Sequence, residues 1–458
     1  MQIAVHALKL CKRDPHWFGR WIGQWCGALA LSSVWTIAAV MVSTVGPPQL
    51  AYAADGVAQV MTLAALIDEL KQTNPQLEQA HQAYVAAQFQ VPQARSLPAP
   101  ELTLTEQGNT GGSFDFKPEN GFFAYPTFTQ PFLWPGKRGL AADVASAQAE
   151  IVGRQYDTLL IQLTAQLKLS VFQLLTLQEQ LRFMGEDQQR LAQIKSLAQV
   201  RYANNAAAFV EFLNAQVAAS SLDNDRLALE RQIQTTKEQI NTLVGRPART
   251  DLQVQDPEGH PQLPAQSLDA LLDLARRTNP ALSASQYQVE AADKGLALAQ
   301  KAFRPDFSLS AGTYTDPWLN HLFSSTRMYS VGVTMTLPTW GFAKEHAGVG
   351  QARAALAQAK AGQDAERQQL ELGVANAYHE LQTALQQMQF AKDRLLPQAQ
   401  MAYRLALSAY SSNGSTAFSD LLVAQGGLRS TELASLQAQN AALQAYVSLV
   451  AAIGREPE

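Results

Sequence analysis

Residues 62–77 read TLAALIDELKQTNPQL, and residues 267–282 read SLDALLDLARRTNPAL, so one pattern returns after 205 positions. Each copy starts at a Thr or Ser that suits a helix N-cap, and Thr-Asn-Pro stops the helix because the residue before a proline disfavours the α conformation. A repeat of this length is too long for a short solenoid unit. It predicts a chain built from two copies of one unit, related by pseudo-symmetry.

The correspondence extends through most of the chain. The matched residues are Pro100–Leu104 with Pro305–Leu309, Thr129 with Thr334, Gly136 with Gly341, Tyr202 with Tyr410, and Gly245-Arg246 with Gly454-Arg455. The earlier pairs keep the offset of 205, which drifts to 208–209 toward the end of each copy. We therefore expect the first copy over residues 54–250, a linker rich in Pro, Asp and Gln over 251–266, and the second copy over 267–458.

The composition excludes several classes of protein. Of the 458 residues, 47% are hydrophobic and 16% are charged, with a formal net charge of −4. A wholly disordered chain is excluded, and the lack of a long Lys/Arg block argues against nucleic-acid binding. The only cysteines, Cys11 and Cys26, cannot form a disulfide scaffold, a Cys-based zinc site or an iron–sulfur cluster.

The first 53 residues have the organisation of a secretory signal peptide. A basic start is followed by a long apolar stretch, and the small-residue site Ala51-Tyr52-Ala53 closes the segment. An uncleaved membrane anchor is the alternative. Cleavage after Ala53 would remove both cysteines and leave an exported, mildly acidic protein. Since no other apolar run is long enough for a membrane helix, any span of a membrane would use β-strands.

Each copy is expected to contain two strands, where apolar and polar residues alternate. These strands cover about 100–110, 121–133, 305–315 and 327–337. Each has the length of a tilted membrane-spanning strand, but four strands cannot close a barrel and an open edge is unstable in lipid, so several chains would have to contribute. Trp134 and Trp340, where the returning strands end, suit a membrane interface. Two soluble hairpins packed on the helices are the alternative.

Long helices are expected over residues 137–203, 207–246, 342–411 and 416–454. No proline interrupts the first, and its leucines recur every seven residues, which predicts a left-handed coiled coil. The heptad leucines are Leu160, Leu167, Leu174 and Leu181. Another face is rich in Ala and Gln, which is compatible with a tube of helices or with a simple antiparallel coiled coil. In the second copy, Pro397 predicts a kink.

The turns between long helices share a second pattern, in which a Tyr is followed by a Phe, an acidic residue and Ala-Gln. The residues that suit these tight turns are Asn204, Asn205, Asn413 and Gly414. Glu211 and Asp420 occupy equivalent places in the first turns of the returning helices. One interpretation is a favourable position in the helix dipole. The other is an acidic ring that selects cations and narrows the end of a tube.

The sequence contains no recognisable catalytic or cofactor motif. Its histidines lack the spacing of a metal site, and no nucleophile elbow, P-loop or dinucleotide-binding motif occurs. We therefore expect neither an enzyme, nor a bound cofactor, nor a metal site.

Together these features resemble the TolC family of outer-membrane efflux channels. The resemblance rests on the doubled Thr-Asn-Pro starts, the paired turns and the strand-to-helix junction TQPFLWPGKR at 129–138, and it covers nearly all of the chain after residue 53. The junction residues are Pro131, Pro135, Gly136 and Lys137. The resemblance implies a mainly α fold with a transmembrane β-barrel. In a homotrimer, two tandem α-β-β-α repeats with four strands per chain would give a twelve-stranded barrel and a long periplasmic coiled-coil tunnel.

The same resemblance implies a passive conduit in the outer membrane of a Gram-negative bacterium. As part of a tripartite system it would carry small molecules or metal cations from an inner-membrane pump of RND type to the exterior, with a periplasmic adaptor protein docked on the four turn residues. Aspartates of the second copy narrow the aperture in the family. Asp420 matches that position, but the second expected aspartate is Val423, so Glu211 is a further candidate. A type I secretion channel and an exported coiled-coil protein without a pore remain alternatives.

Overall fold

The computed structural model describes residues 60–107, 123–255, 263–264, 266–315, 327–337, 342–412 and 417–455. All of them belong to one compact unit, Ala58–Glu458. The expected signal peptide over 1–53 and three of the singled-out residues, Trp340, Asn413 and Gly414, lie outside the described residues.

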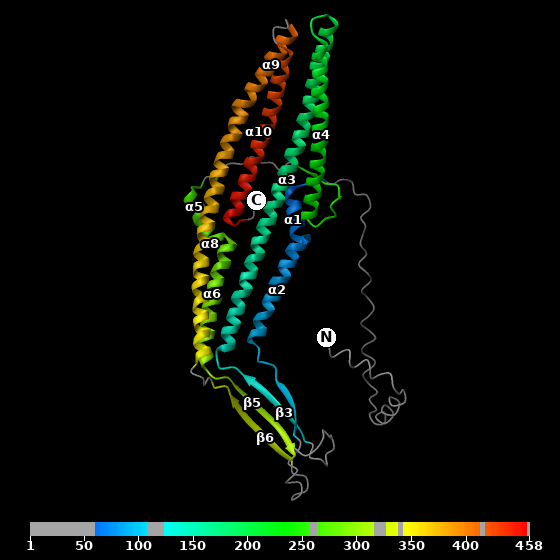
Figure 1. The fold of residues 1–458 in the computed structure, drawn as a ribbon. Coiled ribbons are helices and arrows are strands. Elements are labelled where there is room, and N and C mark those ends of the chain that lie inside the picture. The colour runs from blue at the N-terminus through cyan, green and yellow to red at the C-terminus, as the bar shows by residue number, and fades with distance from the viewer. Residues whose placement is uncertain are drawn as a thin grey trace, which may run out of the picture. The chain divides into compact units, whose positions relative to one another are not determined.

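The secondary-structure elements occur in the same order twice (Figure 1). The first copy contains β1 (Val60–Met61), α1 (Leu63–Thr73), α2 (Pro75–Arg95), β2 (Glu101–Gln107), β3 (Phe123–Phe132), α3 (Lys137–Ala203) and α4 (Phe209–Leu243). The second copy contains β4 (Gln253–Val254), α5 (Leu268–Thr278), α6 (Pro280–Gln300), η2 (Lys301–Phe303), β5 (Phe307–Thr315), β6 (Arg327–Met335), α8 (Ala343–Phe390), η3 (Ala391–Leu395), α9 (Leu396–Ser412) and α10 (Phe418–Ile453).

The helix α3 begins just after the sheet and ends at the turn that leads into α4. It has 67 residues, and at ~1.5 Å per residue it is about 100 Å long. The turn between α3 and α4 is therefore separated from the sheet by the full length of that helix. We call the turn with its two flanking helix ends the first tip, and the corresponding end of α9 and start of α10 the second tip.

The Thr-Asn-Pro sequence of each copy ties its first helices to its last one. Asn74 caps α2 by accepting two backbone N–H groups of the first turn, and its amide donates to the Leu243 carbonyl of α4 (2.6 Å). Asn279 caps α6 in the same way and donates to the Ala452 carbonyl of α10 (3.1 Å). The repeated motif therefore does more than stop a helix, because it holds both ends of each copy together.

A glycine ends the last helix of each copy where Thr-Asn-Pro packs against it. Gly245 and Gly454 have φ of +80° and +84°, in the left-handed region that favours glycine. A Cβ on Gly245 would collide with the carbonyl of Thr73, and one on Gly454 would collide with Asn279. The glycine of the repeated Gly-Arg pair thus follows from the close packing of the first and last helices.

Four strands form one antiparallel sheet in the order β2-β3-β5-β6, and the two copies meet at its centre, where β3 pairs with β5. Paired residues share a face of the sheet, which gives it one exposed apolar face and one polar face. The apolar face includes Leu102, Leu104, Phe128, Leu309, Tyr329, Val331, Val333 and Met335. The polar face includes Thr103, Thr127, Thr129, Ser308, Ser310, Gly312, Ser330, Gly332 and Thr334.

The hairpin of the second copy is shifted in register by two residues relative to the first. Glu101 lies opposite Thr129, whereas the carbonyl of Asp306, the equivalent of Glu101, accepts the N–H of Thr336 (2.9 Å). Thr129 therefore corresponds to Thr336, and its assignment to Thr334 is wrong by two residues. The sequence agrees with this correction, because a proline follows two positions after Thr129 (Pro131) and two positions after Thr336 (Pro338). A shift of two keeps every side chain on its face, so alternation alone does not reveal it.

The apolar residues of α3 form the main core of the first copy. Leu167 and Leu174 of the predicted heptad are fully buried, together with residues of α1 and α4, and Leu160 is partly buried against them. By length and composition, α3 is apolar enough to cross a membrane. Part of its apolar surface is buried against α1 and α4.

The counterpart of α3 in the second copy is interrupted by a π-helix. Leu174 and Leu381, both fully buried, are 207 positions apart, whereas Tyr202 and Tyr410 are 208 apart. The five-residue π-helix η3 lies between Leu381 and Tyr410 and absorbs the extra residue. Pro397, which lacks an N–H, is the second residue of α9. The kink expected at Pro397 stays a prediction, and the observed irregularity is the π-helix, which ends two residues before this proline.

Candidate functional site at the helix tips

The two tips pack against each other within the chain. Their common core contains side chains from α3, α4, α9 and α10. Its buried members are Leu191, Ile194, Ala198, Ala215, Leu222, Tyr403, Tyr410, Phe418, Leu421 and Leu428. The candidate residues at the tips therefore lie next to a hydrophobic cluster to which both copies contribute side chains.

Tyr410 connects the second tip to the first. Its hydroxyl donates to the Glu211 carboxylate (2.5 Å), and the guanidinium of Arg201 lies over its ring, 4.4 Å from the centroid. Arg201 also donates to the carbonyl of Tyr410. Burial and the hydrogen bond to Glu211 raise the pKa of Tyr410 above its ordinary value. The hydroxyl therefore keeps its proton and remains a donor at neutral pH.

The two acidic candidates have different surroundings although they are equivalent in sequence. Glu211 is half-buried in the first turn of α4 and accepts the Tyr410 hydroxyl. Asp420 is exposed in the first turn of α10. Within the described part of the chain, its carboxylate has neither a hydrogen bond nor an ion pair. The structure thus leaves Asp420 as the freely accessible carboxylate of the pair.

The turn of the first tip is built by its two asparagines. Asn204 is the C-cap of α3, and Asn205 follows with φ of +50°, a left-handed conformation that asparagine tolerates better than most residues. The N–H of Ala206 closes the turn on the carbonyl of Arg201 (2.8 Å). Asn204 and Asn205 are exposed, while their counterparts in the second turn lie outside the described residues.

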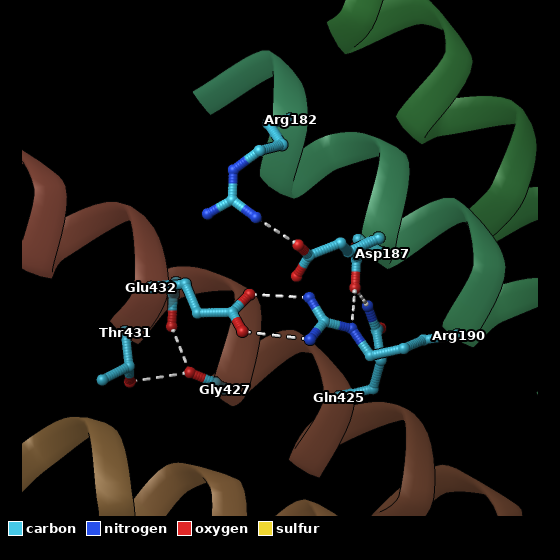
Figure 2. A network of polar contacts seen from close by, with 9 residues as sticks. Arg182, Asp187, Arg190, Gln425, Gly427, Thr431 and Glu432 are labelled. Carbon is cyan, nitrogen blue, oxygen red and sulfur yellow. Dashed lines mark hydrogen bonds and ion pairs between the residues drawn. The ribbon is translucent and has the colours of Figure 1, made fainter. Parts of the chain in front are cut away.

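A buried ion network joins α3 to α10 on the sheet side of the tips (Figure 2). Arg190 donates to both carboxylate oxygens of Glu432 (3.0 and 2.6 Å) and to Asp187 (3.2 Å). Gln425 donates to the same Asp187 oxygen (2.7 Å). Burial opposes the charge of Arg190, but the hydrogen bonds to Glu432 and the nearby Asp187 outweigh it and raise the pKa of Arg190.

None of the residues predicted from the sequence as site residues belongs to this network. Asp187 is 1% exposed, and the second oxygen of its carboxylate has no partner in the described residues. The available signal was the pair Asp187 and Arg190, which are three residues apart and therefore neighbours on one helix face, next to the seam residues Met184 and Leu191. Arg190 lies three residues further along the same helix, but Gln425 and Glu432 come from the other copy, and no pattern along one helix could identify those two.

The strand-to-helix junction is held by an ion pair between the two copies. The Lys137 ammonium donates to both carboxylate oxygens of Asp306 (2.9 Å each), and the backbone N–H of Trp134 donates to the first of them (2.7 Å). Gly136, with φ of +90°, directs the chain from the strand into α3. Pro131 is paired in β3, before the junction. Asp306, the residue that organises this corner, was not a sequence candidate.

The comparisons with known proteins follow the repeated architecture. Residues 66–246 and 271–455, one block in each copy, match the family described as outer membrane efflux protein. The chain belongs to the outer membrane efflux protein family. Its similarity to "Pyoverdine export outer membrane protein OpmQ" of Pseudomonas aeruginosa is 24% identity over 340 residues, which is 70% of this chain and 67% of that protein.

Solved structures share the fold of this outer membrane efflux protein. The outer membrane protein VceC of Vibrio cholerae superposes with a TM-score of 0.72 at 23% identity, covering 86% of this chain and 97% of VceC. CusC superposes with a TM-score of 0.74 at 18% identity, covering 88% of this chain and 96% of CusC. The resemblance to the TolC family is confirmed, as are the outer-membrane location and the efflux-channel class.

Its family identifies this protein as an outer-membrane channel rather than an enzyme. Passive outer-membrane channels make up the family and its structural neighbours. In the described ranges, no group of three or more His, Cys, Asp or Glu side chains is arranged to hold a metal ion.

Proposed function

We propose that three copies of this protein form a passive channel that carries small molecules or metal cations across the outer membrane. Four strands from each copy would close a twelve-stranded barrel, and the long helices would form a periplasmic tunnel. The observation that carries this proposal is the two-faced sheet β2-β3-β5-β6. Its exposed apolar face suits lipid, and its Ser, Thr and Gly face suits a water-filled lumen.

The edges of the sheet support assembly from several chains. Within the described sheet, β2 and β6 each pair on one side only. Unpaired backbone groups are unstable in lipid, and pairing β6 of one copy with β2 of the next would satisfy both edges. Trp134 and Trp340 would mark the membrane interface at the ends of the returning strands. The segment 1–53 would direct export as a signal peptide.

The tips support a constriction at the periplasmic end. Asp420 is the better candidate to line the aperture because its carboxylate is exposed, whereas Glu211 is half-buried within the chain. A ring of carboxylates would favour cations. Opening would then require the tips to separate, with rupture of the contacts that Tyr410 makes with the first tip.

The proposed partners of the channel are those of a tripartite export system. A periplasmic adaptor protein would dock on the exposed turns, and an inner-membrane pump of RND type would supply the energy. The proposed docking residues are Asn204, Asn205, Asn413 and Gly414. The name of OpmQ, which specifies pyoverdine export, supports a small-molecule cargo.

Single-channel recording in a planar bilayer tests the proposal. We expect the purified chain to form trimers by mass measurement and to give discrete, cation-preferring conductance steps that increase in Asp420→Asn. The matched control is Asp68→Asn, which removes an exposed carboxylate on α1. Equal steps in both variants and the native chain would remove Asp420 as the constriction. A monomeric protein without steps would overturn the channel assembly itself.

A further inference from the structure

The same aromatic pair occurs at both tips but is buried at only one of them. The rings of Tyr202 and Phe209 are 5.3 Å apart at the first tip, and those of Tyr410 and Phe418, their equivalents, are 5.6 Å apart at the second. Tyr410 and Phe418 are 1% and 5% exposed, whereas Tyr202 and Phe209 are 48% and 49% exposed. The first tip therefore displays a pair that the second tip buries against a neighbouring hairpin.

Each tip also has a carboxylate that could accept a tyrosine hydroxyl, but only Glu211 does so within the chain. Tyr410 of the second tip packs on the first tip and donates to Glu211. Asp420 is equivalent to Glu211, is exposed, and has no hydrogen bond or ion pair among the described residues. Tyr202 and Asp420 are thus an exposed donor and an exposed acceptor of matching chemistry, one on each tip.

We infer that Tyr202 of one subunit donates a hydrogen bond to Asp420 of the neighbouring copy, while the Tyr202–Phe209 pair packs on that copy's second tip. This inference rests on the proposed trimer. In a closed ring of such chains, first tips and second tips alternate around the ring axis. One rotation then relates each tip to the next, both within a chain and between neighbouring chains. The contact of Tyr410 with Glu211 is then repeated as a contact of Tyr202 with Asp420.

The inference also assigns a role to the acidic residue at the aperture. A carboxylate that accepts a tyrosine hydroxyl keeps its negative charge and loses side-chain freedom. Tyr202 would therefore be a positioning residue for Asp420 of the neighbouring copy. A second copy is the partner that this patch fits, because the chain already contains the complementary surface and uses its equivalent internally.

The two versions of the contact differ in the acceptor, which is Glu211 within the chain and Asp420 between copies, and in the residue before the second-tip or first-tip tyrosine. Arg201 lies over the Tyr410 ring and donates to the Tyr410 carbonyl. Its equivalent in the second copy is Ala409, so no guanidinium is available at that place to stack on Tyr202 of the neighbouring copy. The contact between subunits would lack both the cation–π interaction and the charged hydrogen bond, and it would be weaker than the one within each chain.

Thiol crosslinking with a matched internal pair tests the inference. A tyrosine-to-carboxylate distance is too long for a direct disulfide, so a short bis-maleimide is used on Tyr202→Cys/Asp420→Cys and, as the control, on Tyr410→Cys/Glu211→Cys. Cys11→Ser and Cys26→Ser remove the native thiols. We expect the first variant to shift from monomer to covalent dimer and trimer on a denaturing gel. The control should crosslink within the chain and keep the mobility of a monomer.

The outcomes separate this inference from the assembly on which it rests. Native trimers in which the thiol introduced by Tyr202→Cys stays reactive to a monofunctional maleimide, without crosslinks between chains, would overturn the inference and leave the channel proposal standing. Such a result would indicate that the exposed pair Tyr202 and Phe209 contacts a partner other than a second copy of this chain. Absence of trimers under native conditions would instead remove the assembly. A second readout is Tyr202→Phe, which should increase the conductance in the same direction as Asp420→Asn, whereas no change would count against a positioning role.

Discussion

Arg190 of α3 and Glu432 of α10 are joined by two hydrogen bonds, of 3.0 and 2.6 Å, across the boundary between the two copies. Asp187 approaches the same guanidinium from its own helix. A buried ion pair of this kind contributes modestly as a whole, but removal of one partner leaves the other buried and unpaired. The pair therefore favours one relative position of α3 and α10 along their axes.

Removal of the charge at Glu432 should destabilise the helical part of the protein. For Glu432→Gln we expect a loss of about 3 kcal/mol, toward the lower end for a broken buried pair because Arg190 keeps its contact with Asp187 and retains some exposure. The measurement is the guanidinium midpoint of the helical circular dichroism signal. Glu230→Gln, which breaks an exposed pair with Arg226 on α4, is the control and should cost below about 0.5 kcal/mol. Similar midpoints for both variants would contradict the prediction.

The glycines that end α4 and α10 should not tolerate a side chain. Gly454→Ala is expected to destabilise by roughly 1–3 kcal/mol or more, because it combines a left-handed φ with a collision against Asn279. Gly362→Ala, in the middle of α8 with open space around it, should instead stabilise by up to about 1 kcal/mol. Thermal unfolding of both variants provides the measurement, and equal effects would refute the packing argument.

Tyr410 should link the stability of the tips to alkaline pH. Because its folded pKa is raised, its contribution is fully present below the ordinary tyrosine pKa of about 10 and is lost as the pH rises through the higher folded pKa. We expect Tyr410 to be among the last tyrosines to ionise in an ultraviolet titration. Tyr410→Phe should remove this alkaline step, and a step of unchanged size in that variant would show that another group causes it.

The two faces of the sheet should respond oppositely to a charge. Val333→Lys places an ammonium on the apolar face and should cost roughly 2–4 kcal/mol near the bilayer midplane, with loss of membrane-inserted protein. Thr334→Lys changes the adjacent position on the polar face, so insertion should persist and the cation preference of the conductance should fall. Loss of insertion in both variants would argue against a lumen-facing polar side.

The local features of the fold were predictable because they depend on neighbours in sequence. The long helix expected over 137–203 is observed as α3, Lys137–Ala203. The heptad leucines and the absence of proline define such a helix without reference to the rest of the chain. The same holds for the alternation in the four strands and for the N-caps at Thr62 and Ser267.

The features that the sequence did not reveal depend on contacts between the copies or on register. The shift that pairs Asp306 with Thr336 preserves the faces of the sheet and is therefore invisible to a pattern of alternation. The difference between Glu211 and Asp420 arises because Tyr410 reaches only one of them within the chain. A single sequence shows that the two residues are equivalent, but their surroundings depend on which tip packs against which.

Because of the π-helix, the two copies connect their tips to the sheet by different kinds of helix. α3 is one uninterrupted helix, clamped where it leaves the sheet by Lys137 and Asp306, so a twist applied at its tip is transmitted to that clamp. The path through α8 and α9 contains η3, where the regular hydrogen-bond ladder is broken. The first tip is thus connected to the strands by one regular helix, whereas the connection of the second tip contains the irregular segment Ala391–Leu395, where we expect the helix to twist more easily.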